Sequence, residues 1–304
     1  MTATNLTAAP ATPATTIPAG QPSFRDLVRM EVRKLRYRPM TFVIFGIMAA
    51  LLSGLMAIGY IATRASERPP GVSLDQDVQS FLFPGVFQDG FGIIGGIGGI
   101  LLVVISAAII GSEYSWGTIR VLVGSGVPRA RLIASKLVTV ALVTIALTLV
   151  GFIAFTVTSV GIAIFGGHTL DMSWLNGSTA IDLLLMFVRT IFILFVSAVL
   201  AFTVTVFSRS LAAGIAVGIG FMVFEGIAVG LLGLMGNVGE TISNFLLSPN
   251  MNAISELNYI GERTWSSDGL PDPWRAAALL TAYTVAMIAA SFWIFRRRDV
   301  SSGG

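Results

Sequence analysis

Residues 90–111 read GFGIIGGIGGILLVVISAAIIG, an apolar run without a single charged side chain. A helix needs about 20 mostly apolar residues to cross the hydrocarbon core of a bilayer, and this run has that length. Five further segments qualify in the same way, namely 41–62, 137–165, 180–207, 211–236 and 273–295. The sequence therefore predicts an all-α polytopic membrane protein with about six transmembrane helices.

The composition of the whole chain supports the same class. Of its 304 residues, 54% are hydrophobic and only 12% are charged, whereas a soluble domain carries about 25% charged residues. The chain has no cysteine, and His168 is its one histidine, so thiolate and multi-histidine metal sites are excluded. No histidine accompanies a serine within the spans, as a membrane serine protease would require. We therefore expect no enzymatic activity and no cofactor or metal bound by this chain.

Basic residues are unevenly divided between the two sides of the expected membrane. Fourteen of the 19 Lys and Arg residues fall near the two termini and in the 112–136 and 208–210 loops. Four fall in the alternate loops, and Arg189 lies within a span. The positive-inside rule places the richer side in the cytoplasm. We therefore expect a multi-pass protein of the cell membrane with both termini cytoplasmic.

The two ends of the chain differ from the spans in composition. Residues 1–22 are rich in Thr, Ala and Pro and carry no charged side chain, which predicts a disordered cytoplasmic tail. Residues 299–304 predict a second, short flexible tail. The transmembrane domain is then expected to occupy residues 23–298.

Residues 23–38 predict an amphipathic helix ahead of the first span. Ser23 and Asp26 have the spacing of a capping box, and Pro39 ends the helix. Apolar side chains recur at spacings of three and four residues, at Phe24, Val28, Val32 and Leu35. The charged side chains of the helix include Arg25, Arg29, Glu31, Arg33 and Lys34. Such a helix is expected to lie flat in the anionic inner interface, although simple positive-inside anchoring of the first span would use the same charges.

The basic loop at 112–136 begins with the sequence EYSWGTIR at 113–120. Ile119, Leu122 and Val123 would share one face of a short helix, which the following glycines would end. Pro128 stands where the next helix could begin. We expect Glu113 to form a salt bridge with Arg129 or Arg131, or to contact a partner protein.

This block resembles the signature of ABC-2-type transporter permeases, the membrane subunits of ATP-binding-cassette transporters. The similar residues are 113–120, 126–129 and 132–136, together with the basic lead-in at 30–34. The order of six spans and the long external segment before the last span also match. The resemblance extends over about residues 24–298.

The resemblance implies a permease dimer, of two copies or of two homologous chains, that pairs with two separate cytoplasmic ATPase subunits. ATP and Mg²⁺ would be bound by those partners and not by this chain. The residues implied to contact the ATPase lie in the interfacial helix and in a coupling loop formed by Glu113, Tyr114, Gly117, Thr118 and Arg120. The external segment at 241–259 could form a re-entrant hairpin. Independently, the phosphate-binding motif Gly-x-x-x-x-Gly-Lys-Ser/Thr is absent from the sequence.

Three charged residues lie in or at the end of the spans, namely Asp182, Arg189 and Glu225. Intramembrane charges are costly and often functional. They could line a cargo route, or Arg189 and Glu225 could form a structural ion pair between two spans, because both are at similar depth. Glycines four residues apart favour close helix packing, at Gly92 and Gly96, Gly95 and Gly99, Gly214 and Gly218, and Gly226 and Gly230.

The leading hypothesis is therefore the permease subunit of an ATP-driven exporter. The alternative is an autonomous six-span channel, secondary carrier or membrane anchor. A carrier should contain internal repeats, and residues 41–165 show no convincing repeat of 180–295. A channel needs a filter-like loop, for which 237–272 is a weak candidate.

Overall fold

The computed structural model describes residues 22–66, 78–124, 126–170, 172–260 and 269–297, without the side chains of Arg120 and Val123. These residues form helices and connecting turns and contain no strand. The predicted tails lie outside the described residues, apart from Pro22. Six described helices are long and apolar enough to cross a membrane: α2 (Pro39–Ala65), α4 (Gly85–Ser115), α6 (Arg129–Gly166), α7 (Gly177–Ser208), α8 (Leu211–Gly233) and α11 (Pro273–Arg297). The predicted fold class is confirmed.

The helix ends coincide with capping residues and not with the limits of the apolar runs. α6 begins at Arg129 with Pro128 in the N-cap position, eight residues before the apolar run at 137–165, because a helix continues beyond the membrane until a cap stops it. Gly167 and Arg209 adopt left-handed backbone conformations and end α6 and α7. α8 is shorter than predicted and ends at Gly233.

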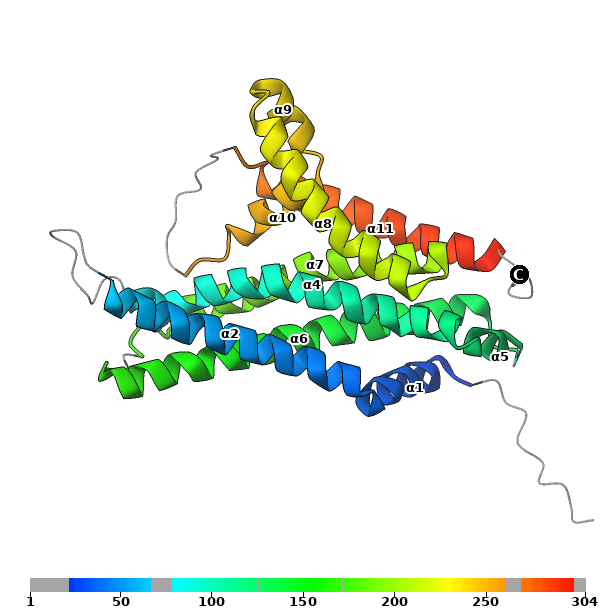
Figure 1. The fold of residues 1–304 in the computed structure, drawn as a ribbon, viewed down its shortest axis with the longest axis horizontal. Helices are drawn as coiled ribbons and strands as arrows, with labels where there is room; N and C mark the ends of the chain where they lie inside the picture. Colours follow the sequence, from blue (N-terminus) through cyan, green and yellow to red (C-terminus); the bar gives the residue numbers. More distant parts are fainter. Residues whose placement is uncertain (1–21, 67–77, 125, 171, 261–268, 298–304) are drawn as a thin grey trace, which may run out of the picture.

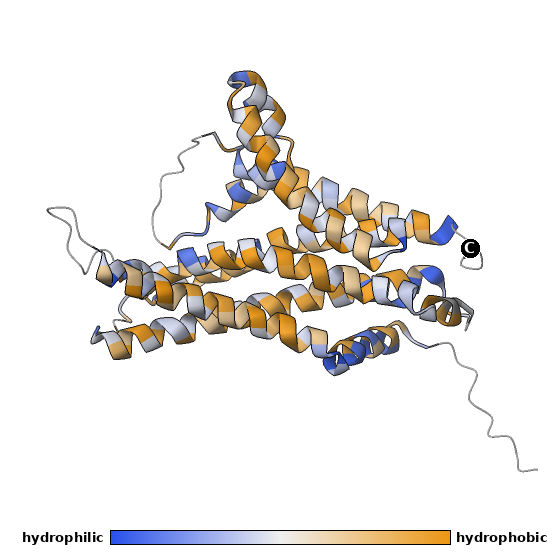
Figure 2. Ribbon diagram, in the orientation of Figure 1, coloured by the Kyte–Doolittle hydropathy of each residue, from blue (hydrophilic) through white to orange (hydrophobic). Residues whose placement is uncertain are grey.

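The long helices form a bundle around α4 (Figure 1). α4 is the most buried of the six and packs most extensively against α7. α2 and α6 cover one side of this pair, and α8 and α11 lie on the other. Figure 2 shows apolar residues along the whole length of these helices. Apolar side chains that face outward, such as Phe42 and Ile58, are therefore suited to contact lipid.

The predicted glycine contacts occur at some of the pairs and not at others. Gly214 lies against Thr205 of α7, and Gly218 lies against Val103 of α4, so that a Cβ atom at either glycine would collide with its neighbour. These two allow α8 to approach the bundle closely. Gly92 and Gly96 face no neighbouring side chain within this chain, so close packing is not their role among the described residues.

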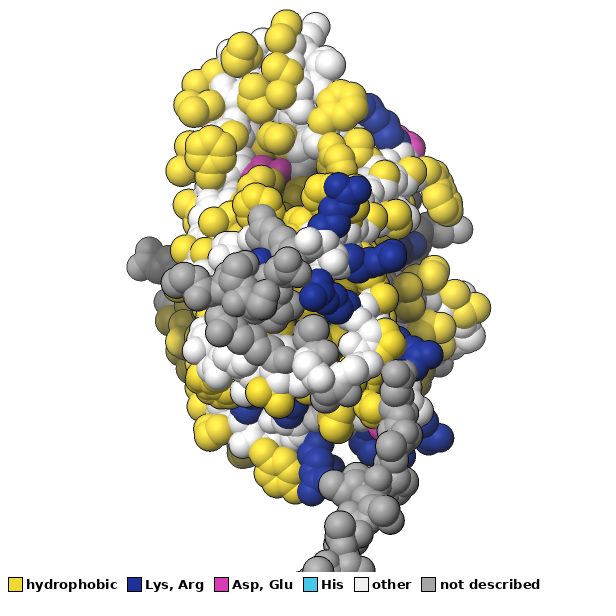
Figure 3. Space-filling view, turned by 90° about the vertical axis from the view of Figure 1, so that its right-hand side faces the viewer, with side chains coloured by type: hydrophobic (Ala, Val, Ile, Leu, Met, Phe, Trp, Pro, Cys, Tyr) yellow, Lys and Arg dark blue, Asp and Glu magenta, His cyan; other side chains and the backbone are white. Residues whose placement is uncertain are grey.

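Both ends of the described chain lie at the same end of the bundle (Figure 1). This basic end consists of α1 (Phe24–Tyr37), α5 (Thr118–Gly124) and the last turns of α11. Figure 3 looks onto it and shows several Lys and Arg side chains and few acidic ones. The short helices η1 (Gln79–Phe81), α9 (Asn237–Ser243) and α10 (Leu247–Ser255) lie away from it. This arrangement agrees with six crossings, and the cytoplasmic placement of the basic end stays a prediction.

Candidate functional site

The interfacial helix α1 begins with the predicted capping box. The Ser23 hydroxyl accepts from the Asp26 amide and the Asp26 carboxylate accepts from the Ser23 amide, each at 3.3 Å. The hydroxyl also donates to the Asp26 carboxylate at 2.6 Å, and this hydrogen bond lowers the pKa of Asp26. At the other end, Arg38 is extended and Pro39 begins α2, so the predicted helix boundaries are confirmed.

The face that α1 buries differs in part from the predicted one. Leu27, Glu31 and Leu35 are buried, and α1 packs mainly against α6. Phe24, which the sequence assigns to the apolar face of the helix, is exposed. The shift has a physical reason: the buried stripe contains a charged residue, which a hydropathy pattern scores as solvent-facing. Arg25, Arg29 and Arg33 remain exposed on the far side as a basic stripe.

Four charged side chains from three helices form a closed ring of ion pairs at the basic end, here named the ion-pair cluster. Its members are Glu31 and Lys34 of α1, Glu113 near the C-terminus of α4, and Lys136 of α6. Nζ of Lys34 lies 2.9 Å from Glu31 and 2.8 Å from Glu113. Nζ of Lys136 lies 3.2 Å from Glu31 and 2.8 Å from Glu113. The cluster therefore ties α1 to the ends of α4 and α6.

The ion-pair cluster is largely removed from solvent. The side chain of Lys136 is 0% exposed and that of Lys34 is 37% exposed, and both carboxylates are buried. Buried charges are tolerated only when they compensate one another, and two lysines balance two glutamates here. Burial lowers the pKa of Lys34, but Glu31 and Glu113 outweigh it, so that this pKa is raised. Lys34 is therefore protonated at neutral pH.

The chain contains two lysines among 19 basic residues, and both belong to this cluster. A lysine ammonium is a compact charge with three rotatable donors, so one nitrogen can bond several oxygens in different directions. Nζ of Lys136 contacts both carboxylates and also donates to the Ile109 carbonyl at 3.3 Å. The planar guanidinium of arginine could not occupy this position in the same way.

The last two turns of α4 are bound by cations from two neighbouring elements. Lys136 bonds the Ile109 carbonyl, and Nη1 of Arg38 donates to the Ala108 carbonyl at 3.3 Å. Cations near the carbonyl end of a helix are favoured by its dipole. The Arg38 guanidinium also lies 5.2 Å from the centre of the Trp116 ring, just beyond the helix.

The predicted coupling loop comprises the last turn of α4, the turn at Gly117 and the start of α5. The apolar face of α5 already packs within this chain. Ile119 is buried and Leu122 packs against the core of the bundle, so this face is not free to dock onto another protein. The surface left open contains Trp116, which is 68% exposed, Val121, which is 73% exposed, and Thr118.

The remaining residues of that loop have mixed roles. Gly117 forms the turn between α4 and α5 with a positive φ of 67°, which favours glycine. Tyr114 is half-buried against the core. Arg120 lies in α5, and its side chain is outside the described residues.

The predicted salt bridge of Glu113 with Arg129 or Arg131 is wrong, whereas the alternative, a contact with a partner protein, stays a prediction. Glu113 bonds Lys34 and Lys136, whereas Nη1 of Arg129 donates to the Arg296 carbonyl at 3.2 Å. The salt-bridge prediction rests on arginines close in sequence, and it treats Lys136 only as a marker of the inner interface. The signal that could have revealed it is a lysine that directly precedes a long apolar run, because such a side chain must find a partner or reach water.

The intramembrane charges Arg189 and Glu225 do not pair with each other. Glu225 of α8 accepts from the Leu247 amide, from the Ser248 amide at 3.1 Å and from the Ser248 hydroxyl at 2.5 Å. Arg189 of α7 donates to the Leu257 carbonyl at 2.7 Å. A carboxylate therefore caps the N-terminus of α10 and a guanidinium binds just beyond its C-terminus, as the helix dipole favours. Asp182 is half-buried near the start of α7.

The segment that the sequence interprets as a re-entrant hairpin contains α9 and α10. Several of its polar groups are bound by the protein: Asn250 donates to the Asn244 and Leu246 carbonyls, Asn258 donates to Thr190, and Tyr283 donates to the Phe245 carbonyl. Internal satisfaction of this kind is what non-spanning backbone needs at membrane depth. Entry of the hairpin into the membrane stays a prediction.

Fold and site together define a multi-pass α-helical membrane protein whose basic end is joined by a buried ion-pair cluster. The chain belongs to the family described as "Protein of unknown function (DUF2705)", whose model matches residues 81–301. It is also 26% identical, over 215 residues, to the uncharacterized protein YhcI of Bacillus subtilis strain 168. That similarity covers 67% of this chain and 65% of YhcI, slightly less than two thirds of the relative's length.

Proposed function

We propose that this chain is the membrane-spanning permease subunit of an ATP-driven ABC exporter in the cell membrane, driven by a separate cytoplasmic ATPase. The ion-pair cluster is the observation that carries the proposal. It joins the interfacial helix α1 to the ends of α4 and α6, which flank α5. A displacement of α1 would therefore act on two spans at once, because buried, mutually compensating charges cannot separate without a large electrostatic cost. α5 connects the same two spans along the chain.

The proposed division of labour places all nucleotide chemistry on the partner. ATP and Mg²⁺ would bind the ATPase, and its closure would push on the basic end of this chain. The exposed side of α5, with Trp116 and Val121, and the basic stripe of α1 are accessible for such a contact. This chain then acts as a transporter subunit and not as an enzyme.

The proposal includes a second permease, either another copy or a homologous chain. The resemblance to ABC-2-type permeases motivates it, and α8 is the span least buried within this chain. Its outward side chains include Val223, Phe224 and Ile227. In the alternative, an autonomous channel, carrier or anchor, this apolar face would contact lipid alone.

A matched pair of variants tests the coupling surface. Val121→Asp places a charge on α5 at the basic end, and Val238→Asp makes the same change on α9. Val121 is 73% exposed and Val238 is 61% exposed, and both helices have seven residues. Neither residue belongs to the ion-pair cluster, so both variants should fold. We expect Val121→Asp to lose co-purification with the ATPase and its stimulation in proteoliposomes, and Val238→Asp to keep both.

Two results would count against the proposal. If Val121→Asp binds and stimulates the ATPase as well as Val238→Asp does, α5 is not the contact surface. If no ATPase is recovered with the parent chain, even after chemical cross-linking in membranes, the permease function itself fails and the autonomous six-span alternative replaces it.

A further inference from the structure

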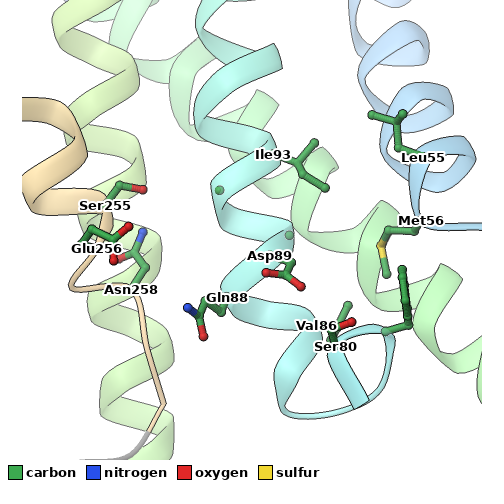
Figure 4. A pocket seen from close by; sticks show the side chains of 13 residues that line it. Leu55, Met56, Ser80, Val86, Gln88, Asp89, Ile93, Ser255, Glu256 and Asn258 are labelled. Carbon is green, nitrogen blue, oxygen red and sulfur yellow. The ribbon is translucent and has the colours of Figure 1, made fainter. Parts of the chain in front are cut away.

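A cavity of about 460 Å³, drawn from close by in Figure 4, is lined by none of the residues of the ion-pair cluster. It is bounded by α2, by η1 and the first turns of α4, and by the residues at the end of α10. A volume of a few hundred Å³ is typical of sites that bury a small organic ligand. Neither the proposed coupling nor the family match assigns a role to this space.

One wall of the cavity is apolar and the other is rich in acceptors. Leu55 and Met56 of α2 face it together with Ile93 of α4. Figure 4 shows Asp89 on α4 between these side chains and Glu256, which follows α10. The described lining residues include two carboxylates but no Lys, Arg or His. Such a lining attracts a positive charge and repels an anion.

A buried amide adds a second, independent feature. Asn258 lines the cavity and is 3% exposed. Its Nδ2 donates to the Thr190 hydroxyl at 3.2 Å, whereas its Oδ1 has no hydrogen-bond partner among the described residues. An unsatisfied buried acceptor is costly, and a ligand that donates an N–H can relieve that cost.

We propose that this cavity binds a primary or secondary ammonium group carried on a compact apolar body. The ammonium would donate a charge-assisted hydrogen bond to the exposed carboxylate of Asp89, which lines the cavity. The apolar body would lie against Leu55, Met56 and Ile93. The N–H donors distinguish this ligand class from a quaternary ammonium, which cannot donate to Asn258.

The intramembrane charges give this cavity a fixed wall. Glu225 caps the start of α10, and Arg189 binds the Leu257 carbonyl directly before Asn258. Arg189 and Glu225 are therefore positioning residues for the cavity and do not line it. The inference is independent of the proposed ATPase, because ligand binding would be a property of this chain alone.

Fluorine NMR on the full-length chain in zwitterionic lipid nanodiscs tests the proposal. The probe is 4-fluorophenethylamine, compared with 4-fluorophenethyl alcohol and 4-fluorophenylacetate. We expect saturable line broadening for the amine alone, because the alcohol lacks the charge and the acetate carries the wrong one. Asp89→Asn should weaken binding about tenfold or more, the usual effect of losing one charge-assisted hydrogen bond.

Glu240→Gln is the matched control, since it removes a carboxylate charge from an exposed residue of α9 that does not line the cavity. Glu256→Gln removes the second carboxylate of the lining. This variant is tested in place of Asp89→Asn if Asp89→Asn does not elute as a folded protein in size-exclusion chromatography. Equal broadening by the amine and the alcohol would mean partition into the bilayer and would overturn the proposal. Equal binding by the lining variants and the Glu240→Gln control would overturn it as well.

Discussion

Replacing Lys136 by methionine tests whether the ion-pair cluster stabilises the fold. The Lys136 ammonium is fully buried and lies 3.2 Å from Glu31 and 2.8 Å from Glu113. Without it, two buried carboxylates would share Lys34, whose side chain is 37% exposed. Removal of one partner from a buried pair typically costs about 3–5 kcal/mol, because the remaining charge stays buried without compensation. We expect Lys136→Met to lose stability in this range.

Companion variants separate the cluster from general effects of charge removal. Lys34→Met should cost about 1 kcal/mol, because its partly exposed ammonium is screened by solvent. Combining Lys136→Met with Glu113→Gln leaves one glutamate and one lysine and restores neutrality. The double variant should therefore be more stable than the sum of the single effects by about 1–3 kcal/mol. Arg29→Met removes an exposed charge from α1 and should be nearly neutral.

Thermal unfolding in detergent, followed by fluorescence-detected size-exclusion chromatography, measures these differences. One kcal/mol shifts Tm by about 2–4 °C for a domain of roughly this size. Lys136→Met should therefore melt about 6–20 °C below the parent, and Lys34→Met about 2–4 °C below it. Two results would refute the view of the cluster as one compensated unit. The first is a Lys136→Met variant with the same Tm as the parent. The second is a double variant whose loss of stability equals the sum of the losses in the two single variants.

Two other predictions concern topology and the anchoring of α10. The chain has no native cysteine, so Val121→Cys and Ser178→Cys can each be probed on intact cells with an impermeant maleimide. The cysteine at position 178, at the start of α7, should react, and the cysteine at position 121 should not. The opposite pattern would invert the predicted orientation. Glu225→Ala and Arg189→Ala should each cost about 1–3 kcal/mol in thermal unfolding. Their effects should nearly add, because they bind different ends of α10, and a coupling energy above about 1 kcal/mol would argue for direct pairing.

The sequence predicts the helices because the bilayer imposes a single dominant requirement. A spanning helix must be apolar over about 20 residues, and this length is visible without any knowledge of tertiary contacts. Local chemistry is equally visible: the capping box of Ser23 and Asp26 and the helix start after Pro128 depend on residues only a few positions apart. Each of these features was predicted and is present.

Partners of buried charges could not be predicted in the same way. Lys34 and Glu113 are 79 residues apart in sequence, and nothing in the local pattern of either selects the other. Sequence reasoning therefore paired Glu113 with nearby arginines, and paired Arg189 with Glu225 by depth. Depth places two groups at one level in the membrane but does not fix the directions of their side chains, which depend on how the helices are rotated against one another.

Short helices at both ends of the bundle depend on a few specific polar contacts. α1 and α10 have 14 and nine residues, too few to gain the broad apolar contact of a spanning helix. α1 is held through the ion-pair cluster, and α10 through Glu225 at its start and Arg189 beyond its end. The free energy needed to move such a helix depends on these polar contacts and on its few buried apolar side chains, such as Leu27 in α1 and Ile254 in α10. A force on α1 at the basic end, or a ligand beside α10 away from it, could therefore displace one short helix while the six long helices remain packed.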